Sequence, residues 1–280
     1  MHHSLRRGTA EQSIRAETMR LKRFSDCPWA LSALVVVLTA ATAVRADGLS
    51  QTTVFSAGEE DYFGFRIPTI LLAGNGDLLA IAEGRVNSLA DQGDIDLVMK
   101  RSTDDGATWG PLQIIRGEGT NTAGNPAPVL DKSTGRLHLL YSINQNDVRV
   151  MSSLDHGVTW THPRDIHDDV SDPTWTWHVP GPVHGIQLER GPHTGRLVIP
   201  SDHVSPSTGW GSHTLYSDDA GESWHLGGKI VHGDYGEGIV RPNESTAVEL
   251  VDWEGEDCVW RRARIPTIYF NRERYHDLVE

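Results

Sequence analysis

Three copies of one eight-residue pattern, S-x-D-x-G-x-[TS]-W, constrain the fold of this chain more than any other feature of its sequence. The copies begin at Ser102, Ser153 and Ser217, so their starts lie 51 and 64 residues apart. In such a turn the Ser and Asp side chains can bond to backbone groups, the Gly permits a positive φ, and the Trp can fill the core beside a hairpin. Recurrence at this period is typical of propeller blades of four strands each. We therefore interpret the turns as structural and assign no substrate contact to them.

Short strand-like runs occupy the sequence between the turns. One run precedes each copy of the pattern, and further pairs of runs flank the turn-forming residues at 74–77 and 133–135. No segment has the periodicity of a long amphipathic helix. The sequence predicts an all-β fold, a β-propeller with only about four blades present in this chain. Because a propeller ring must close to protect its edge strands, we expect further blades outside this sequence.

The N-terminal region has the pattern of a signal peptide with an extended basic flank. An uncharged stretch at residues 30–43 is too short to span a bilayer comfortably, basic residues precede it, and Ala46 supplies a small residue before the expected cleavage near Asp47. We expect a secreted or extracytoplasmic protein; the alternative is a membrane anchor formed by residues 30–44. The sequence thus divides into a signal region (1–46), propeller blades (47–252) and a divergent charged C-terminal segment (253–280).

Charge and cysteine content exclude several classes of partner. Residues 1–46 hold seven of the 25 Lys and Arg and three of the 38 Asp and Glu, so the remainder carries a formal charge of −17. Nucleic acid is therefore not expected as a partner. An anionic sugar is not excluded, because fields fade over about 8 Å at physiological salt. Cys27 lies in the signal region and Cys258 stands alone, so no internal disulfide is expected after cleavage.

No cofactor is implied by any motif, and no metal site is predicted. The sequence has 14 histidines but no His-x-x-x-His pair and no Cys/His cluster. The segment His167-Asp168-Asp169 is the best metal candidate, and its spacing is weak. No obligate protein partner is evident.

Five ordered segments resemble a known enzyme family. They are residues 65–68 (F-R-I-P), 82–85 (A-E-G-R), 91–96 (D-Q-G-D-I-D), 181–188 (G-P-V-H-G-I-Q-L) and 242–250 (P-N-E-S-T-A-V-E-L). Together with the repeated turns they resemble the exo-α-sialidases (neuraminidases) over roughly residues 50–252. The resemblance implies a six-bladed propeller that removes terminal sialic acid, with retention, from glycoproteins, glycolipids or oligosaccharides. Such enzymes use an arginine triad, an Asp acid/base, and a Tyr nucleophile assisted by a Glu; a neutral phenol avoids repulsion by the substrate carboxylate.

Two arginines and one asparagine match substrate-binding positions of this family. Arg66 matches the first arginine of the triad, whose planar guanidinium can pair with the substrate carboxylate, and a surface salt bridge is the alternative. Arg85 matches an arginine that contacts the ring substituents near the C4 hydroxyl, or else is solvated. Asn125 lies where an amide reaches the same substituents, although an Asn before Pro also forms turns.

Two carboxylates match the catalytic positions. Asp91 lies in a polar loop where the family places its general acid/base; the alternative is a solvated acidic loop. Glu244 matches the Glu that accepts the proton of the nucleophilic Tyr, with Glu249 as the alternative. Asn243 begins the only glycosylation sequon, and we expect it to be unmodified, because a glycan there would block the pocket.

The aromatic segment around residue 176 leaves two interpretations open. Trp175 and Trp177 could form an apolar wall for the sugar or could fill the core. Neither His178 nor His184 has a partner visible in the sequence, so we interpret both as structural.

The family pattern breaks after residue 250. The strand that precedes the second triad arginine in the family is lost here, so the sequence leaves open whether Arg262, Arg264 or neither takes that place, and Tyr269 and Tyr275 lie in no matching motif. We therefore expect this chain by itself to be inactive, since no residue matches the nucleophile. The hypotheses are an exo-α-sialidase or, alternatively, a non-catalytic propeller that binds carbohydrate or protein. The sequence does not separate hydrolysis from transfer of sialic acid.

Overall fold

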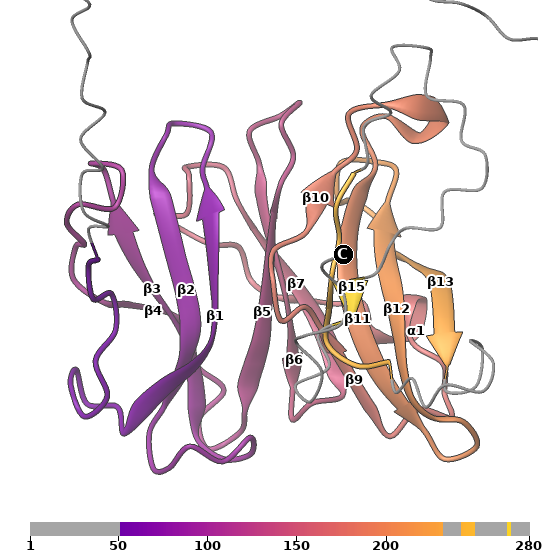
Figure 1. Ribbon diagram of the computed structural model, residues 1–280, viewed down its shortest axis with the longest axis horizontal. Coiled ribbons are helices and arrows are strands. Elements are labelled where there is room, and N and C mark those ends of the chain that lie inside the picture. Colours follow the sequence, from indigo (N-terminus) through magenta and orange to yellow (C-terminus); the bar gives the residue numbers. More distant parts are fainter. Residues whose placement is uncertain (1–50, 232–241, 250–267, 270–280) are drawn as a thin grey trace, which may run out of the picture. The chain divides into compact units, whose positions relative to one another are not determined.

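The computed structural model describes residues 51–231, 242–249 and 268–269 (Figure 1). The signal region and most of the segment 253–280 lie outside the described residues. The regular secondary structure of the described part is almost entirely β-strand, which confirms the predicted all-β fold; its helical elements are α1 (His167–Val170) and the single 3-10 turn η1 (Gly191–His193). No helix of the described part is long and apolar enough to cross a membrane.

Two four-stranded antiparallel sheets come first. Sheet 1 has the order β1 (Gly64–Leu72), β2 (Leu78–Arg85), β3 (Ile95–Ser102) and β4 (Gln113–Arg116). Sheet 2 has the order β5 (Ala123–Leu130), β6 (Leu137–Ile143), β7 (Asp147–Ser153) and β8 (Arg164–Asp165). In both, neighbouring strands follow one another in sequence, as in the meander of a propeller blade.

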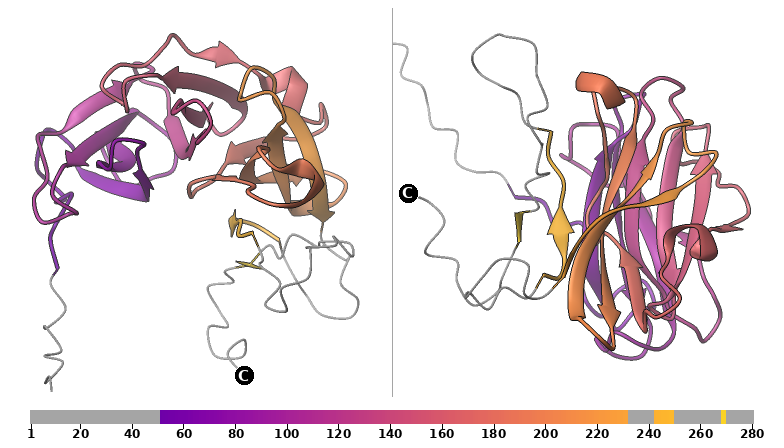
Figure 2. Two further views of the ribbon diagram at one scale, coloured as in Figure 1. Left: turned by 90° about the horizontal axis from the view of Figure 1, so that it is seen from above. Right: turned by 90° about the vertical axis from the view of Figure 1, so that its right-hand side faces the viewer.

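Sheet 3 repeats this meander with an interrupted first strand. It comprises β9 (Trp177–Pro180), β10 (Ile186–Gln187), β11 (Leu197–Ser205), β12 (Gly209–Ser217) and β13 (His225–Val231). Both β9 and β10 pair with β11 along one edge, and β12 pairs along the other. A short pair follows, β14 (Ser245–Thr246) with β15 (Ile268–Tyr269). Strand β1 contacts β5, and β5 contacts β9, so the first strands of successive sheets are neighbours (Figure 2).

The three repeated turns have one hydrogen-bond pattern, as the sequence predicts. In the first copy, Asp104 Oδ1 accepts from Ser102 Oγ at 2.7 Å and from Thr108 N at 2.9 Å, while Gly106 N donates to Ser102 Oγ at 2.8 Å. Gly106 has a φ of 84°, which only glycine adopts without cost. Because Thr108 and Ser102 donate to it, the carboxyl of Asp104 has its pKa lowered to about 2.

The second and third turns also pack against the sheet before them. Arg101 of sheet 1 donates to the carbonyl of His156 in the second turn at 2.8 Å, and Arg164 of sheet 2 donates to Gly221 in the third turn at 3.1 Å. Trp224 is almost fully buried in the core between sheets 2 and 3. The repeated pattern therefore specifies both the hairpin and the contact between consecutive sheets.

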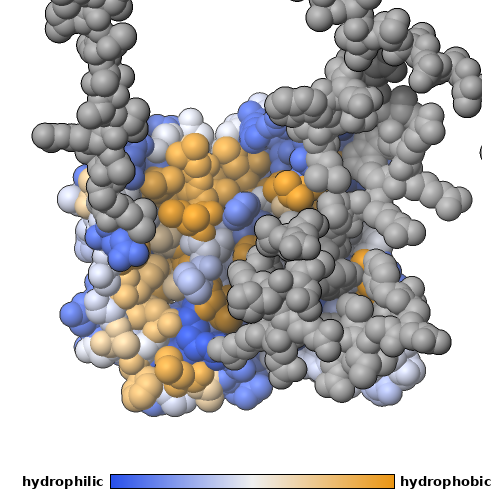
Figure 3. Space-filling view, viewed as in Figure 1, coloured by the Kyte–Doolittle hydropathy of each residue, from blue (hydrophilic) through white to orange (hydrophobic). Residues whose placement is uncertain are grey.

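One face of sheet 1 is turned away from sheet 2. There Ile70 and Leu72 of β1 are 48% and 58% exposed, within an apolar area visible over this strand in Figure 3. On the opposite face, Leu71 and Leu79 pack into the core shared with sheet 2. An exposed face of this kind is expected where a neighbouring blade would pack.

Candidate active site

A β-bulge positions Arg66 on the first strand. The register of β1 against β2 shifts between Arg66 and Thr69, and Ile67 has a φ of 53°. A positive φ is unusual for a β-branched residue and costs about 1–3 kcal/mol, which the surrounding structure must offset. Pro68 follows and has no amide hydrogen to leave unpaired at the bulge. The bulge re-aims the side chain of Arg66, which is 42% exposed.

Strand β5 contains the same distortion. Its register shifts between Gly124 and Ala127, and Asn125 has a φ of 56°. Asn125 is 8% exposed and lies within the strand rather than in a turn. The two first strands are thus bent at equivalent places, each directly before a proline.

Arg85 is buried at the end of β2 and held by several acceptors. Its Nε and Nη2 donate to Glu83 Oε2 at 2.9 and 2.5 Å, and its Nη1 donates to the carbonyls of Leu89 and Ala90 at 2.5 and 2.7 Å. The side chains of Arg85 and Glu83 are only 2% and 3% exposed. This anchoring contradicts the alternative of a solvated arginine.

Glu83 is a residue that the sequence reasoning missed. Its Oε1 accepts from the backbone N–H of Asn125 at 2.9 Å, so it joins sheet 1 to the bulge of sheet 2. Burial raises the pKa of Glu83, an effect that the positive charge of Arg85 opposes. A glutamate directly after the apolar run L-L-A-I-A (78–82) was the available signal, since a carboxylate buried with such a run requires a partner.

Asp91 joins the two arginines. Its Oδ1 accepts from Arg66 Nη1 at 2.6 Å and from Arg85 Nη1 at 3.0 Å, while its side chain stays 54% exposed. The structure therefore brings together three of the residues expected at the site. A ligand carboxylate would compete with Asp91 for Arg66, because both groups bind a guanidinium in the same way.

Glu244 lies beside sheet 3, immediately before β14, and is exposed. The adjacent Asn243 accepts a hydrogen bond through its carbonyl from Ser212 Oγ at 2.5 Å, which ties this segment to β12. Asp202 of β11 is the register partner of Ser212 and accepts from Trp177 Nε1 at 3.1 Å. Burial, together with the negative charge of Glu244, raises the pKa of Asp202 well above its usual range. Sequence reasoning missed Asp202, because it lies within a strand and belongs to no motif that resembles the family.

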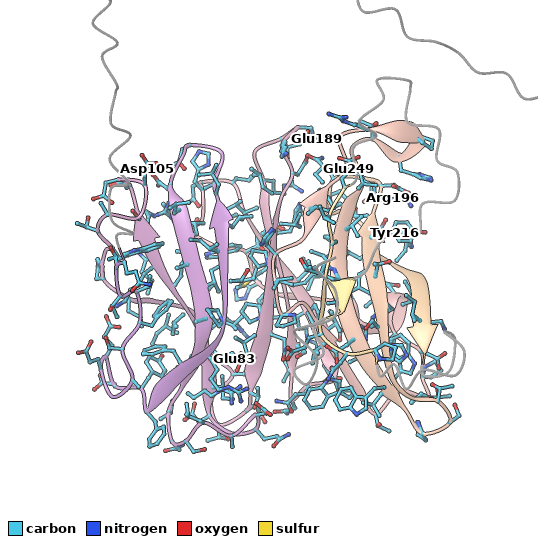
Figure 4. All side chains as sticks on the ribbon, viewed as in Figure 1. Glu83, Asp105, Glu189, Arg196, Tyr216 and Glu249 are labelled. Carbon is cyan, nitrogen blue, oxygen red and sulfur yellow. The ribbon has the colours of Figure 1, made fainter. Side chains whose placement is uncertain are left out.

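Glu249 has a different environment. Its two carboxylate oxygens accept from the backbone N–H groups of Glu189 and Arg190 at 2.9 and 3.0 Å. Figure 4 shows Glu249 and Glu189 together near one end of the strands, whereas Glu83 lies toward the other end. Glu249 therefore holds a loop, and Glu244 is the better candidate for the site. No hydrogen bond or ion pair in the described ranges joins Glu244 to Arg66, Arg85 or Asp91.

Trp175 and His178 of the aromatic segment lie in the core. Trp175 is 9% exposed and stacks on His203 at a ring distance of 4.0 Å, which supports its core interpretation. His178 bonds to Ser171 Oγ at 3.1 Å and to His213 Nε2 at 3.0 Å, so the structure supplies partners that the sequence did not reveal. His184 is exposed.

Metal ligation finds no support in the described ranges. They contain no group of three His, Cys, Asp or Glu side chains arranged to hold an ion.

Comparisons with known proteins identify the family. The family model described as a BNR repeat-like domain matches residues 76–251. The chain is 30% identical over 218 residues to a sialidase of Micromonospora viridifaciens, which covers 70% of this chain and 32% of that protein. The chain belongs to the sialidase/BNR-repeat family. An exo-alpha-sialidase of Aspergillus fumigatus is 34% identical over 172 residues, covering 50% of this chain and 41% of that protein.

Solved structures of the family share the propeller fold. The Hadza microbial sialidase Hz136 superimposes with a TM-score of 0.62 at 26% identity, over 70% of this chain and 42% of that one. This confirms the sialidase-type propeller expected from the repeated turns. The chain spans less than half the length of each of these three family members.

Proposed function

We propose that this protein is an exo-α-sialidase that hydrolyses terminal sialic acid from glycoconjugates with retention. The observation that carries the proposal is the cluster in which Asp91 contacts Arg66 at 2.6 Å and Arg85 at 3.0 Å. A sialoside has a carboxylate on its anomeric carbon. An enzyme that cleaves the glycosidic bond therefore needs a guanidinium to bind this carboxylate and an acid to protonate the leaving oxygen, both close to the anomeric carbon. The cluster supplies both groups from two adjacent segments of sheet 1.

Each side chain has a role in this proposal. Arg66 binds the substrate carboxylate, and Arg85 with Asn125 contacts the ring substituents. Asp91 protonates the leaving oxygen and later activates water. Glu244 assists a Tyr nucleophile, which is not assigned to any residue of this chain.

The buried Glu83 supports the site without touching substrate. It holds Arg85 through two N–H groups and fixes the backbone of Asn125. A guanidinium held in this way loses little conformational freedom when it binds a ligand, which favours affinity.

The proposed substrates are sialylated glycoproteins, glycolipids or oligosaccharides, met outside the cell after the signal region at residues 1–46 is removed. An extracytoplasmic location would bring the protein to such glycans. Recovery of the protein in culture medium, with an N-terminus near Asp47, would support this location. Retention in cells with residues 30–44 intact would instead support the anchor.

The test combines binding and turnover on the secreted full-length protein, which is the parent for all variants, because residues 1–280 by themselves are expected to be inactive. Binding of 3′-sialyllactose is followed by saturation-transfer NMR, and turnover by release of a fluorogenic aglycone. We expect Arg66→Leu to lose binding and Asp91→Asn to lose turnover. The matched control is Asp105→Asn, an exposed carboxylate at the other end of sheet 1 from Glu83 (Figure 4), which should behave as the parent.

A correctly folded parent that neither binds nor cleaves the sialoside would refute the proposal. Binding without hydrolysis would favour the non-catalytic, carbohydrate-binding propeller instead. Release of sialic acid onto an added sugar rather than onto water would identify transfer.

A further inference from the structure

The loop that carries Asp91 has little structure of its own. Residues 87–93 are all exposed, and the loop is closed at its base by the bond from Val86 N to Asp94 O at 3.1 Å. A loop of this kind needs outside partners to hold one conformation. Arg66 and Arg85 bind the Asp91 side chain. In the proposed function both arginines also bind the ligand, so the loop needs other contacts to keep its position.

Two side chains from sheet 2 hold the loop backbone. Gly93 N donates to Thr122 Oγ1 at 3.1 Å, and the same hydroxyl donates to Gly93 O at 3.0 Å. Gln145 Nε2 donates to the carbonyl of Asp91. Thr122 and Gln145 are 1% and 5% exposed, so water does not compete for these bonds.

The backbone of each of these two residues is itself held by hydrogen bonds, that of Thr122 by the turn between β6 and β7 and that of Gln145, within this turn, by sheet 3. Asn144 N donates to Thr122 O at 3.0 Å, and Asn144 Oδ1 accepts from Thr122 N at 3.1 Å. The carbonyl of Gln145 accepts from His178 N at 2.9 Å, which connects the turn to sheet 3. The loop backbone is therefore attached to a rigid junction of two further sheets.

We infer that Thr122 and Gln145 are positioning residues that set where Asp91 lies relative to Arg66. Sheet 2 thereby controls the geometry of the acid/base carboxyl on sheet 1. The positioning of the Asp91 loop by Thr122 and Gln145 follows from the hydrogen bonds alone. Its effect on catalysis rests on the proposed function. A carboxyl displaced by even a small distance loses much of its effect on proton transfer.

The experiment measures amide hydrogen exchange over residues 87–94 in the full chain. Thr122→Val keeps the side-chain shape and removes the hydroxyl, whereas Thr122→Ser keeps the hydroxyl. We expect Thr122→Val to speed exchange about five- to 150-fold, as two lost hydrogen bonds predict, and Thr122→Ser to match the parent. Unchanged exchange in β5 and β6 shows that the fold is intact.

A second pair tests the other contact. Gln145→Met removes the amide donor at similar length, and Gln113→Met is the control on the exposed strand β4. We expect faster exchange of the loop only in Gln145→Met. Exchange within twofold of the parent in both Thr122→Val and Gln145→Met, with the fold intact, would overturn the inference.

The catalytic consequence has its own measurement. In a parent that turns over sialoside, Thr122→Val should lower kcat several-fold and displace the pH profile while KM changes little, and Thr122→Ser should restore both. A mobile loop with unchanged kcat and pH profile would refute the catalytic part. If the parent shows no turnover, the proposed function fails, and the exchange data still decide the positioning role.

Discussion

Buried histidines should make the stability of this protein depend on pH between 7.5 and 5. His138 and His178 are fully buried, and burial lowers their pKa values to about 4 and about 3. Nearby positive charge, chiefly from Arg136 and His167 respectively, acts in the same direction. His203 and His213 join the same hydrogen-bonded group as His178, and their pKa values are lowered too.

The sign of the effect follows from linkage. An unfolded histidine has a pKa of about 6.5. Below that pH the histidines of the unfolded chain bind protons, whereas the buried histidines of the folded protein stay neutral. Above about pH 6.5 the folded protein has its full stability with respect to these histidines. This stability is lost as pH falls toward the pKa values of His138 and His178 in the folded protein. Between about pH 6.5 and the pKa of the folded state, each of these histidines lowers the free energy of unfolding by about 1.4 kcal/mol per pH unit. At pH 5 the loss is about 2 kcal/mol for each of His138 and His178, against a total stability of about 5–15 kcal/mol.

Two buried carboxyls act in the opposite direction. Glu83 and Asp202 have raised pKa values, so their protonation stabilises the folded state as pH falls. The slope of the parent alone therefore mixes two effects. The diagnostic quantity is the difference in slope between the parent and His138→Gln, which removes one histidine and no carboxyl.

The assay is guanidinium unfolding at several pH values between 7.5 and 5. We expect the free energy of unfolding of His138→Gln to fall with decreasing pH by about 1.4 kcal/mol per unit less than that of the parent below pH 6. His162→Gln, at an exposed histidine, should keep the parent slope. Equal slopes for His138→Gln and the parent would refute the reasoning.

Two further predictions concern stability. Glu83→Ala should destabilise the protein by about 3–5 kcal/mol, because it leaves two N–H groups of the buried Arg85 side chain and the backbone N–H of Asn125 without their acceptor; thermal or denaturant unfolding measures the loss, and a cost below about 1 kcal/mol would contradict these buried hydrogen bonds. Trp224→Ala should cost about 3–5 kcal/mol by leaving a cavity between sheets 2 and 3, whereas Trp210→Ala, at a residue 37% exposed, should cost much less; equal losses by circular dichroism would contradict the packing described.

Local patterns allowed the fold to be predicted from the sequence. Ser102, Asp104 and Gly106 bond within one turn, so their spacing alone specifies its geometry, and two more copies specify the repeat. Alternating apolar runs between the turns then require strands. The resemblance of residues 65–96 to sialidases also pointed to Arg66, Arg85 and Asp91, which the structure brings together.

Other features could not be predicted, because they depend on which residues face each other across strands and sheets. Glu83 meets Asn125 over a separation of 42 residues, and Thr122 meets Gly93 over 29. No local spacing marks such pairs. His178 likewise looked unpartnered in the sequence, because its partner His213 lies on β12, 35 residues further along the chain.

The sequence by itself determined the turns, the all-β class and the candidate residues of the first sheet, since short-range hydrogen bonds and side-chain alternation act within a few residues. Tertiary structure alone decided what supports those residues. The packing of sheet 2 on sheet 1 brings the backbone N–H of Asn125 to Glu83 and attaches the Asp91 loop to Thr122. Contacts between distant segments arise only when the sheets pack, so they become visible only in the folded protein.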